Sequence, residues 1–336
     1  IDVNGEQVDK QTFLNAYNYT LTMQQYYAQM LQQFGGDGTV DEASILQSTL
    51  DNYISSLVLS QKAKELGFDQ FTDAELAELQ AQAQEEYDTQ LESIRTTYFA
   101  DSELEGDALT AEVTAYAKAN GYTLDYQLDT AKSNKISERL KASVTDTVTI
   151  TDDDLQAALD KEVASEKETF ASTPAAYGTR VNAGTTVYYT PAGYRTIRVI
   201  SVDKPTEEGA SSDEAKQQID ALYLRLTAGE AFETLTEDVK TYAICADSTT
   251  PEADVVAAAM QLTDALSYTE VLETEKAFYL AQLVEELPEH TATLEEARAT
   301  LYDATLTDAQ DTAYNETVQG WINAADVKTY TERLSD

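Results

Sequence analysis

Side chains suited to covalent or metal chemistry are scarce in this chain of 336 residues. Cys245 is the only cysteine and His290 the only histidine. No intramolecular disulfide can therefore form, and the usual zinc ligand sets cannot be assembled. Most pairs of a nucleophile and its base also need one of these residues, and His290 follows Pro288 in a segment typical of a surface loop. We expect neither a metal nor a cofactor.

Aromatic and methionine side chains are the more prominent candidates for a binding role. The chain contains 21 Tyr, 8 Phe and 1 Trp, and Tyr and Met suit contact with varied partners because they are amphipathic and adaptable respectively. Two interpretations are open: a central core helix that is apolar on several sides, or a surface that binds unfolded polypeptides. Exposure of Tyr19 and Tyr26 would favour the surface. The client-binding candidates on the first predicted helix are Tyr19, Met23, Tyr26, Tyr27 and Met30, in a cluster that also includes Tyr17.

Charge narrows the function classes. The chain has 22 Lys and Arg against 61 Asp and Glu, which gives a net charge of -39. Such a surface repels phosphate backbones, so we expect no nucleic-acid partner. Hydrophobic residues make up 42% of the chain, enough for a sizeable core. No apolar run approaches the ~18 residues of a membrane span, and Ile1 to Gly5 are typical of folded structure rather than a signal peptide.

Hydrophobic periodicity and capping signals predict a helical first half. Thr72 to Glu75 has the pattern of a capping box, and Thr151 to Asp154 marks a further helix start. None of these helices can bury its apolar stripe alone, so they must pack on each other or on a bound polypeptide. The predicted helices cover about 9–34, 41–66, 73–97, 108–120, 124–145 and 151–170.

The pattern changes near residue 173, where Pro and Gly punctuate a short stretch that we predict to be irregular. The sequence then predicts short strands with helices between them, a long helix and a closing strand from Asp326 to Leu334. The fold class is therefore α+β and mainly helical. The predicted elements are strands at about 187–189, 194–202 and 277–284, and helices at about 213–227, 253–265 and 293–323.

The order of these segments resembles that of SurA-like and PrsA-like extracytoplasmic foldases. Val3 to Phe13 resembles their opening motif, which leads straight into a long helix, and Leu66 to Phe68 with the box at Thr72 resembles a later junction. The resemblance implies a discontinuous helical chaperone domain with an inserted, small parvulin-like (PpiC-type rotamase) domain. Its expected boundaries are 1–185 completed by 287–336, and 186–286 for the insert.

The parvulin resemblance also identifies pocket positions and their departures from the family pattern. The two family histidines fall on Val199 and Tyr279, and the aromatic pocket residue falls near Val255. Met260 and Thr274 are the pocket-like positions that could still serve. Prolyl isomerisation must lower a rotation barrier of ~20 kcal/mol, and Val199 offers no polar group for that task. We therefore expect impaired catalysis.

The resemblance implies a folding factor that binds unfolded or newly secreted polypeptides outside the cytoplasm of a bacterium, at the cell surface or secreted. Two alternatives are an active peptidyl-prolyl cis-trans isomerase with a rearranged site and a non-catalytic surface binding module. A lipid anchor through a removed N-terminal cysteine and a homodimer are both left open. Rates of prolyl isomerisation and suppression of client aggregation distinguish these functions.

Overall fold

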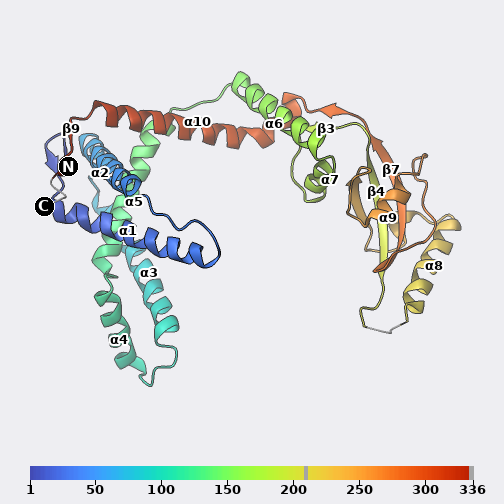
Figure 1. Cartoon of the computed structure of the whole chain (residues 1–336), viewed down its shortest axis with the longest axis horizontal. Helices are drawn as coiled ribbons and strands as arrows, with labels where there is room; N and C mark the ends of the chain where they lie inside the picture. The colour runs from blue at the N-terminus through green and yellow to red at the C-terminus, as the bar shows by residue number, and fades with distance from the viewer. Residues whose placement is uncertain (208–210, 333–336) are drawn as a thin grey trace. The chain divides into compact units, whose positions relative to one another are not determined.

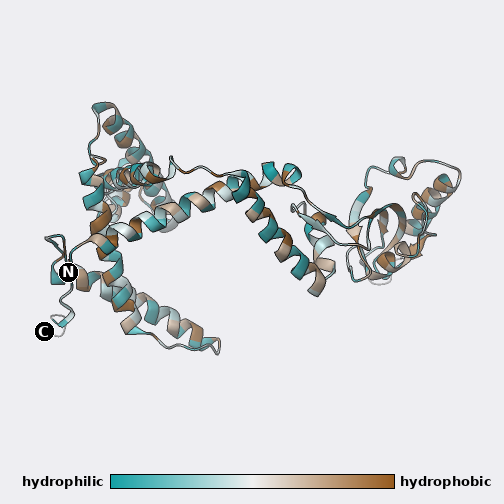
Figure 2. Cartoon of the chain, turned by 90° about the horizontal axis from the view of Figure 1, so that it is seen from above, coloured by the Kyte–Doolittle hydropathy of each residue, from teal (hydrophilic) through white to brown (hydrophobic). Residues whose placement is uncertain are grey.

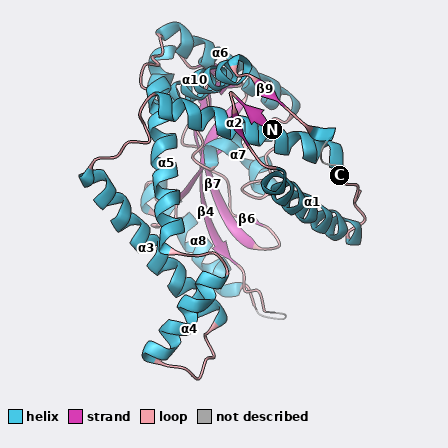
Figure 3. Cartoon of the chain, turned by 90° about the vertical axis from the view of Figure 1, so that its left-hand side faces the viewer, coloured by secondary structure: helices cyan, strands magenta, loops and turns pink. Residues whose placement is uncertain are grey.

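The computed structural model describes residues 1–207 and 211–332. The chain forms two compact units, Ile1–Thr149 with Asp308–Asp336, and Ile150–Thr307. Helices dominate and the strands form small sheets (Figures 1 and 3), which confirms the predicted mainly helical α+β class. The first unit is discontinuous in sequence. The predicted domain boundaries after residues 185 and 286 fall inside the second unit.

A small antiparallel sheet joins the two ends of the described chain in the first unit. Its order is β2-β1-β9. Asn4 and Gly5 have φ values of 53° and 90°, the left-handed pair that a tight two-residue hairpin requires. The predicted closeness of the first segment and the closing strand is confirmed, whereas the predicted end of that strand, Leu334, lies outside the described residues. The strands are β1 (Asp2–Val3), β2 (Glu6–Gln7) and β9 (Val327–Lys328).

The helices of the first unit begin where the sequence provides caps. The predicted capping box is confirmed, with Thr72 and Glu75 exchanging side-chain and backbone hydrogen bonds. Arg139 then fixes the preceding turn, since its guanidinium donates to the carbonyls of Phe68 and Gln70 at 3.0 and 2.8 Å. The helices are α1 (Lys10–Gln33), α2 (Glu42–Glu65), α3 (Asp73–Tyr98), α4 (Gly106–Ala119), α5 (Leu124–Thr145) and the last part of α10 (Leu294–Ala324).

The second unit opens with α6 (Asp152–Ser172) and α7 (Ala175–Asn182). The α7 helix occupies the stretch that the sequence predicted to be irregular. Its Asn182 side chain accepts from the backbone N–H of Ala243 at 2.7 Å and donates to the carbonyl of Ala243 at 3.1 Å. These two hydrogen bonds satisfy the backbone N–H and carbonyl of Ala243 at the edge of its strand, where no neighbouring strand among the described residues could do so.

A buried carboxylate fastens α6 to the strand that follows. Glu166 accepts from the backbone N–H groups of Tyr188 and Tyr189 at 2.7 and 2.8 Å, and Arg180 lies 3.5 Å away. Burial raises the pKa of Glu166, because desolvation disfavours the charged form. The short strands β3 (Tyr189–Thr190) and β8 (His290–Thr291) pair beside this contact.

The main sheet of the second unit is antiparallel, in the order β5-β4-β7-β6. Side chains alternate between its faces, so Ile197 and Val199 pack against α9 while Ile200 packs against α8. The sequence predicted β4 and β7 but only an acidic loop where β5 lies. The elements are β4 (Tyr194–Asp203), α8 (Asp213–Thr227), the short 3-10 helix η1 (Phe232–Thr234), β5 (Lys240–Ile244), α9 (Ala253–Ala259), β6 (Leu272–Glu273) and β7 (Ala277–Leu287).

Candidate functional sites

The two residues at the parvulin histidine positions lie on neighbouring strands. Val199 pairs with Ala281, and Ser201 pairs with Tyr279. Val199 and Tyr279 therefore lie two residues apart across the antiparallel β4–β7 pair, on one face of the sheet. Both positions thus belong to adjacent strands of one small sheet.

Four of the five predicted pocket residues lie together, and one does not. Val199 and Val255 are buried in a single cluster, with Met260 and Tyr279 packed against it. Thr274 lies elsewhere, in the turn between β6 and β7. Its hydroxyl donates to the carbonyl of Ala277 at 3.0 Å and accepts from the N–H of Ala277 at 3.1 Å. Thr274 therefore shapes the turn and does not line the pocket.

A cavity of about 300 Å³ opens beside this cluster. The sequence analysis missed most of its polar wall. Ser201 and Asp203 follow Val199 at alternating positions of β4, so strand periodicity was a usable signal for them. Tyr242 and Glu252 come from β5 and the segment before α9, and only the folded sheet brings them close. The lining residues are Val199, Ser201, Asp203, Lys240, Tyr242, Thr249, Thr250, Pro251, Glu252 and Tyr279.

The electrostatics of this sheet pocket favour a neutral tyrosine. The Tyr279 hydroxyl donates to Glu252 Oε1 at 3.2 Å. Burial, and then the nearby carboxylates of Glu252 and Asp203, raise the pKa of Tyr279 to about 12, because both disfavour a phenolate. The phenol keeps its proton at neutral pH and directs it at Glu252. The pocket can hold a side chain against two tyrosine rings, and neither His nor Cys is among its described lining residues.

The second candidate site is the outer surface of α1. Only Phe13 and Ala28 are buried along this helix. Tyr19 is 70% exposed, Tyr26 61% and Phe34, directly after the helix, 85%. The α1 helix is therefore not a core helix, because a core helix would hide these rings. We call the exposed large apolar residues here the α1 face: Tyr19, Met23, Tyr26, Tyr27, Met30, Leu31 and Phe34.

The α1 face contains all five predicted client-binding residues. The sequence analysis missed Leu31 and Phe34, although both continue the apolar pattern of the helix. The stretch from Gln11 to Gly36 has no charged residue over 26 positions, in a chain of which 25% is charged. Figure 1 shows α1 leaving the terminal sheet, and Figure 2 shows how apolar and polar residues alternate along the helices. The face is therefore uncharged as well as apolar.

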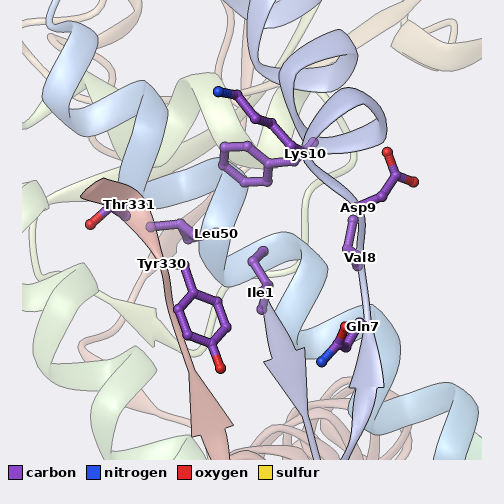
Figure 4. A pocket seen from close by; sticks show the side chains of 9 residues that line it. Ile1, Gln7, Val8, Asp9, Lys10, Leu50, Tyr330 and Thr331 are labelled. Atoms are coloured by element: carbon purple, nitrogen blue, oxygen red, sulfur yellow. The ribbon is translucent and has the colours of Figure 1, made fainter. Parts of the chain in front are cut away.

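A cavity of about 360 Å³ lies at the base of α1, in the same unit (Figure 4). The side chains of Ile1, Val8 and Leu50 supply apolar walls, and Phe13 lines it from the first turns of α1. The Phe13 ring packs against Tyr53 with ring centroids 5.8 Å apart. The remaining lining residues are Gln7, Asp9, Lys10, Tyr330 and Thr331.

A further aromatic cluster joins α3 and α4. The Tyr98 and Tyr116 rings lie 5.1 Å apart, and Phe99 meets Tyr116 edge-on at 5.7 Å. Tyr98 is 63% exposed. Burial and the neighbouring Tyr98 raise the pKa of Tyr116. This cluster was not predicted from the sequence, because Tyr116 belongs to a different helix from Tyr98 and only the α3–α4 packing brings their rings together.

Two further properties concern membranes and metals. Among the described residues, no helix combines the length and apolar character needed to cross a bilayer. Across residues 1–207 and 211–332, no three His, Cys, Asp or Glu side chains gather as a metal site would require.

No family model matches this chain, and no curated protein matches it. Among solved structures it is similar to PrsA from Bacillus subtilis, with 16% identity over 84% of each chain and a TM-score of 0.24. It is similar to the foldase PrsA from Streptococcus pneumoniae, with 16% identity, a TM-score of 0.24, and coverage of 86% of this chain and 88% of that one. A structure from work on PEB4 and Cj1289, SurA-like chaperones of Campylobacter jejuni, shows 14% identity, a TM-score of 0.33, and coverage of 98% and 99%. PrsA-like and SurA-like proteins are the groups that the sequence resembles.

Proposed function

We propose that this protein is an extracytoplasmic chaperone that holds unfolded or newly secreted polypeptides on the α1 face. The observation that carries the proposal is the exposure of seven large apolar side chains within the uncharged stretch from Gln11 to Gly36. Exposed apolar surface rimmed by polar residues marks interaction sites in soluble proteins. The location outside the cytoplasm, at the cell surface or secreted, follows the sequence resemblance.

The composition of the α1 face suits weak contact with many sequences. Met23 and Met30 have flexible, polarizable side chains that adapt to different partners. Tyr19, Tyr26 and Tyr27 supply large ring surfaces that remain compatible with water. The net charge of -39 keeps a chain with such a surface soluble. A chaperone of this kind needs no catalytic group.

The sheet pocket supports a second, weaker activity as the alternative function. Its position beside Val199 and Tyr279 fits a prolyl isomerase site, as the sequence resemblance implies. Val199 is apolar, however, and the hydroxyl proton of Tyr279 is already engaged by Glu252. We therefore expect little acceleration of prolyl isomerisation. A large, saturable acceleration on a prolyl tetrapeptide series, abolished by substituting Tyr279, which lines the pocket, would establish the alternative.

The test of the chaperone proposal is suppression of aggregation of a chemically unfolded client. The variant carries Tyr19→Gln, Tyr26→Gln and Phe34→Gln, because Gln keeps good helix propensity while removing the rings. The matched control carries Leu224→Gln and Tyr302→Gln, which remove exposed apolar side chains from the second unit. We expect the α1 variant to lose most of its protection and the control to keep it. Equal protection by wild type and the α1 variant would refute the proposal, and a module with no folding role would protect in neither form.

A further inference from the structure

We infer that the α1 face selects cationic clients, namely extended apolar segments flanked by Lys or Arg. The inference rests on the proposed function and names its substrate class. It follows from the contrast between an uncharged face and the strongly anionic unit that contains it.

The first unit has a large excess of negative charge. Its sequence contains 31 Asp or Glu residues against 11 Lys or Arg residues. Within the described residues, seven of these cations already pair with a carboxylate of the same unit, so few can attract an anionic client. The paired cations are Lys62, Arg95, Lys132, Lys135, Arg139, Lys141 and Lys328.

Carboxylates flank α1 at both ends. Asp9 caps its first turn, where the hydroxyl and the N–H of Thr12 hold the pKa of that carboxyl below its usual range. Asp37 and Asp41 follow its last turn and are exposed. Asp37 and Asp41 lie directly beyond Phe34, whereas Asp9 lies about 15 Å before Tyr19 along the helix and next to Lys10. A cationic group at the Phe34 end of a bound apolar segment would therefore meet carboxylates, and an acidic group there would be repelled.

The length of the α1 face sets the size of the segment. From Tyr19 to Phe34 the helix rises about 22 Å at ~1.5 Å per residue. An extended polypeptide advances ~3.3 Å per residue, so about seven residues span the face. The fitting client segment is therefore a short aromatic or aliphatic run of about seven residues, with basic residues beside it.

The same charge argues against other occupants of the face. Two copies of a chain with a net charge of -39 repel each other. An anionic lipid surface would repel the chain for the same reason. An acidic client would be repelled likewise. Attraction of a cationic client acts over about 8 Å at physiological ionic strength and weakens as salt is added.

The test uses three fluorescent peptides that share one seven-residue apolar core and differ only in flanks of Lys, Gln or Glu. Anisotropy titrations of the full chain measure each Kd at low and high salt. We expect the Lys peptide to bind at least ~10-fold more tightly than the Gln peptide at low salt, with the Glu peptide weakest. High salt should bring the three affinities together.

Two variants localise the effect. Asp9→Asn, Asp37→Asn and Asp41→Asn together should reduce the Lys preference, and Asn remains a good cap at both helix starts. Asp153→Asn, Asp238→Asn and Asp254→Asn in the second unit form the matched control and should leave it unchanged. Tyr19→Gln, Tyr26→Gln and Phe34→Gln should weaken all three peptides.

Each other outcome overturns a distinct statement. Equal affinity for the three peptides would overturn the charge selection and leave the chaperone proposal intact. Failure of all three to bind would overturn the chaperone proposal itself. If the Lys peptide bound equally well to wild type and to the variant with the Tyr19, Tyr26 and Phe34 substitutions, it would be attracted to the acidic exterior in general. That result would overturn the α1 face as the binding site. Sedimentation of a dimer that those substitutions dissociate would make a second copy the occupant and overturn the inference.

Discussion

Removing the rings of the α1 face should weaken client binding without destabilising the fold. The perturbation is Tyr19→Gln, Tyr26→Gln and Phe34→Gln, compared with Phe13→Ala on the same helix. The three surface residues keep 70%, 61% and 85% of their area exposed, while Phe13 is 3% exposed. Exposed substitutions usually change stability by no more than ~0.5 kcal/mol each.

The magnitudes separate the two roles of the helix. We expect the three Gln substitutions together to change the free energy of unfolding by about 1.5 kcal/mol or less. Phe13→Ala should cost about 3–5 kcal/mol, because it empties a packed site beside Tyr53. If α1 were a core helix, the three substitutions would together cost about 9–15 kcal/mol, which is comparable to the whole ~5–15 kcal/mol that holds most domains folded.

Urea denaturation followed by tryptophan fluorescence is the appropriate assay. Trp321 is the only tryptophan and belongs to the first unit, where the Lys62 ammonium lies 5.6 Å from its ring centre. Its signal therefore reports that unit even if the two units unfold separately. A loss above about 3 kcal/mol in the Gln variant, or none in Phe13→Ala, would refute this assignment of surface and core.

Three further predictions concern the second unit. Glu166→Leu should lower the free energy of unfolding by about 2–5 kcal/mol in urea titrations, because it leaves the backbone N–H groups of Tyr188 and Tyr189 without a hydrogen-bond acceptor. Burial raises the pKa of Glu166, so the folded state binds its proton more tightly than the unfolded state does. The free energy of unfolding of wild type, relative to Glu166→Gln, should therefore rise as the pH falls from above the raised pKa to the usual pKa of a glutamate. A difference between the two proteins that does not change with pH would contradict this. Gly178→Ala should lower the free energy of unfolding by about 1–3 kcal/mol in the same assay, because the added carbon would lie 2.5 Å from the carbonyl oxygen of Ala243. An unchanged urea midpoint would exclude that close approach. Carbon NMR of labelled tyrosine should show Tyr279 titrating near pH 12, and Glu252→Gln should lower that pKa; an unshifted titration would show that the carboxylate does not act on the phenol.

Local signals predicted the helical half of the fold well. The capping box at Thr72 and the start at Thr151 depend on side chains three residues apart, so the sequence contains the whole interaction. Alternation of apolar and polar residues predicted the strand β4, and a second predicted strand corresponds to β7. These features need little information from distant parts of the chain.

The missed elements depend on tertiary contacts. The α7 helix contains Gly178, which breaks helical patterns in a sequence but is needed here because the Ala243 carbonyl approaches so closely. The β5 strand is short, and its pairing with β4 and the Asn182 side chain defines it. Glu252 reaches Tyr279 across 27 residues of sequence. Periodicity also could not decide whether α1 has a partner on every apolar side, and only the folded arrangement exposes Tyr26.

Site-specific photocrosslinking to an unfolded client tests the central claim most directly. A photoreactive amino acid replaces Tyr26 on the α1 face, Leu224 as an equally exposed control, or Tyr242 in the sheet pocket. We predict client adducts from position 26 and none above background from position 224. Adducts from position 224 or 242, with none from position 26, would contradict the assignment of the α1 face as the client-binding surface.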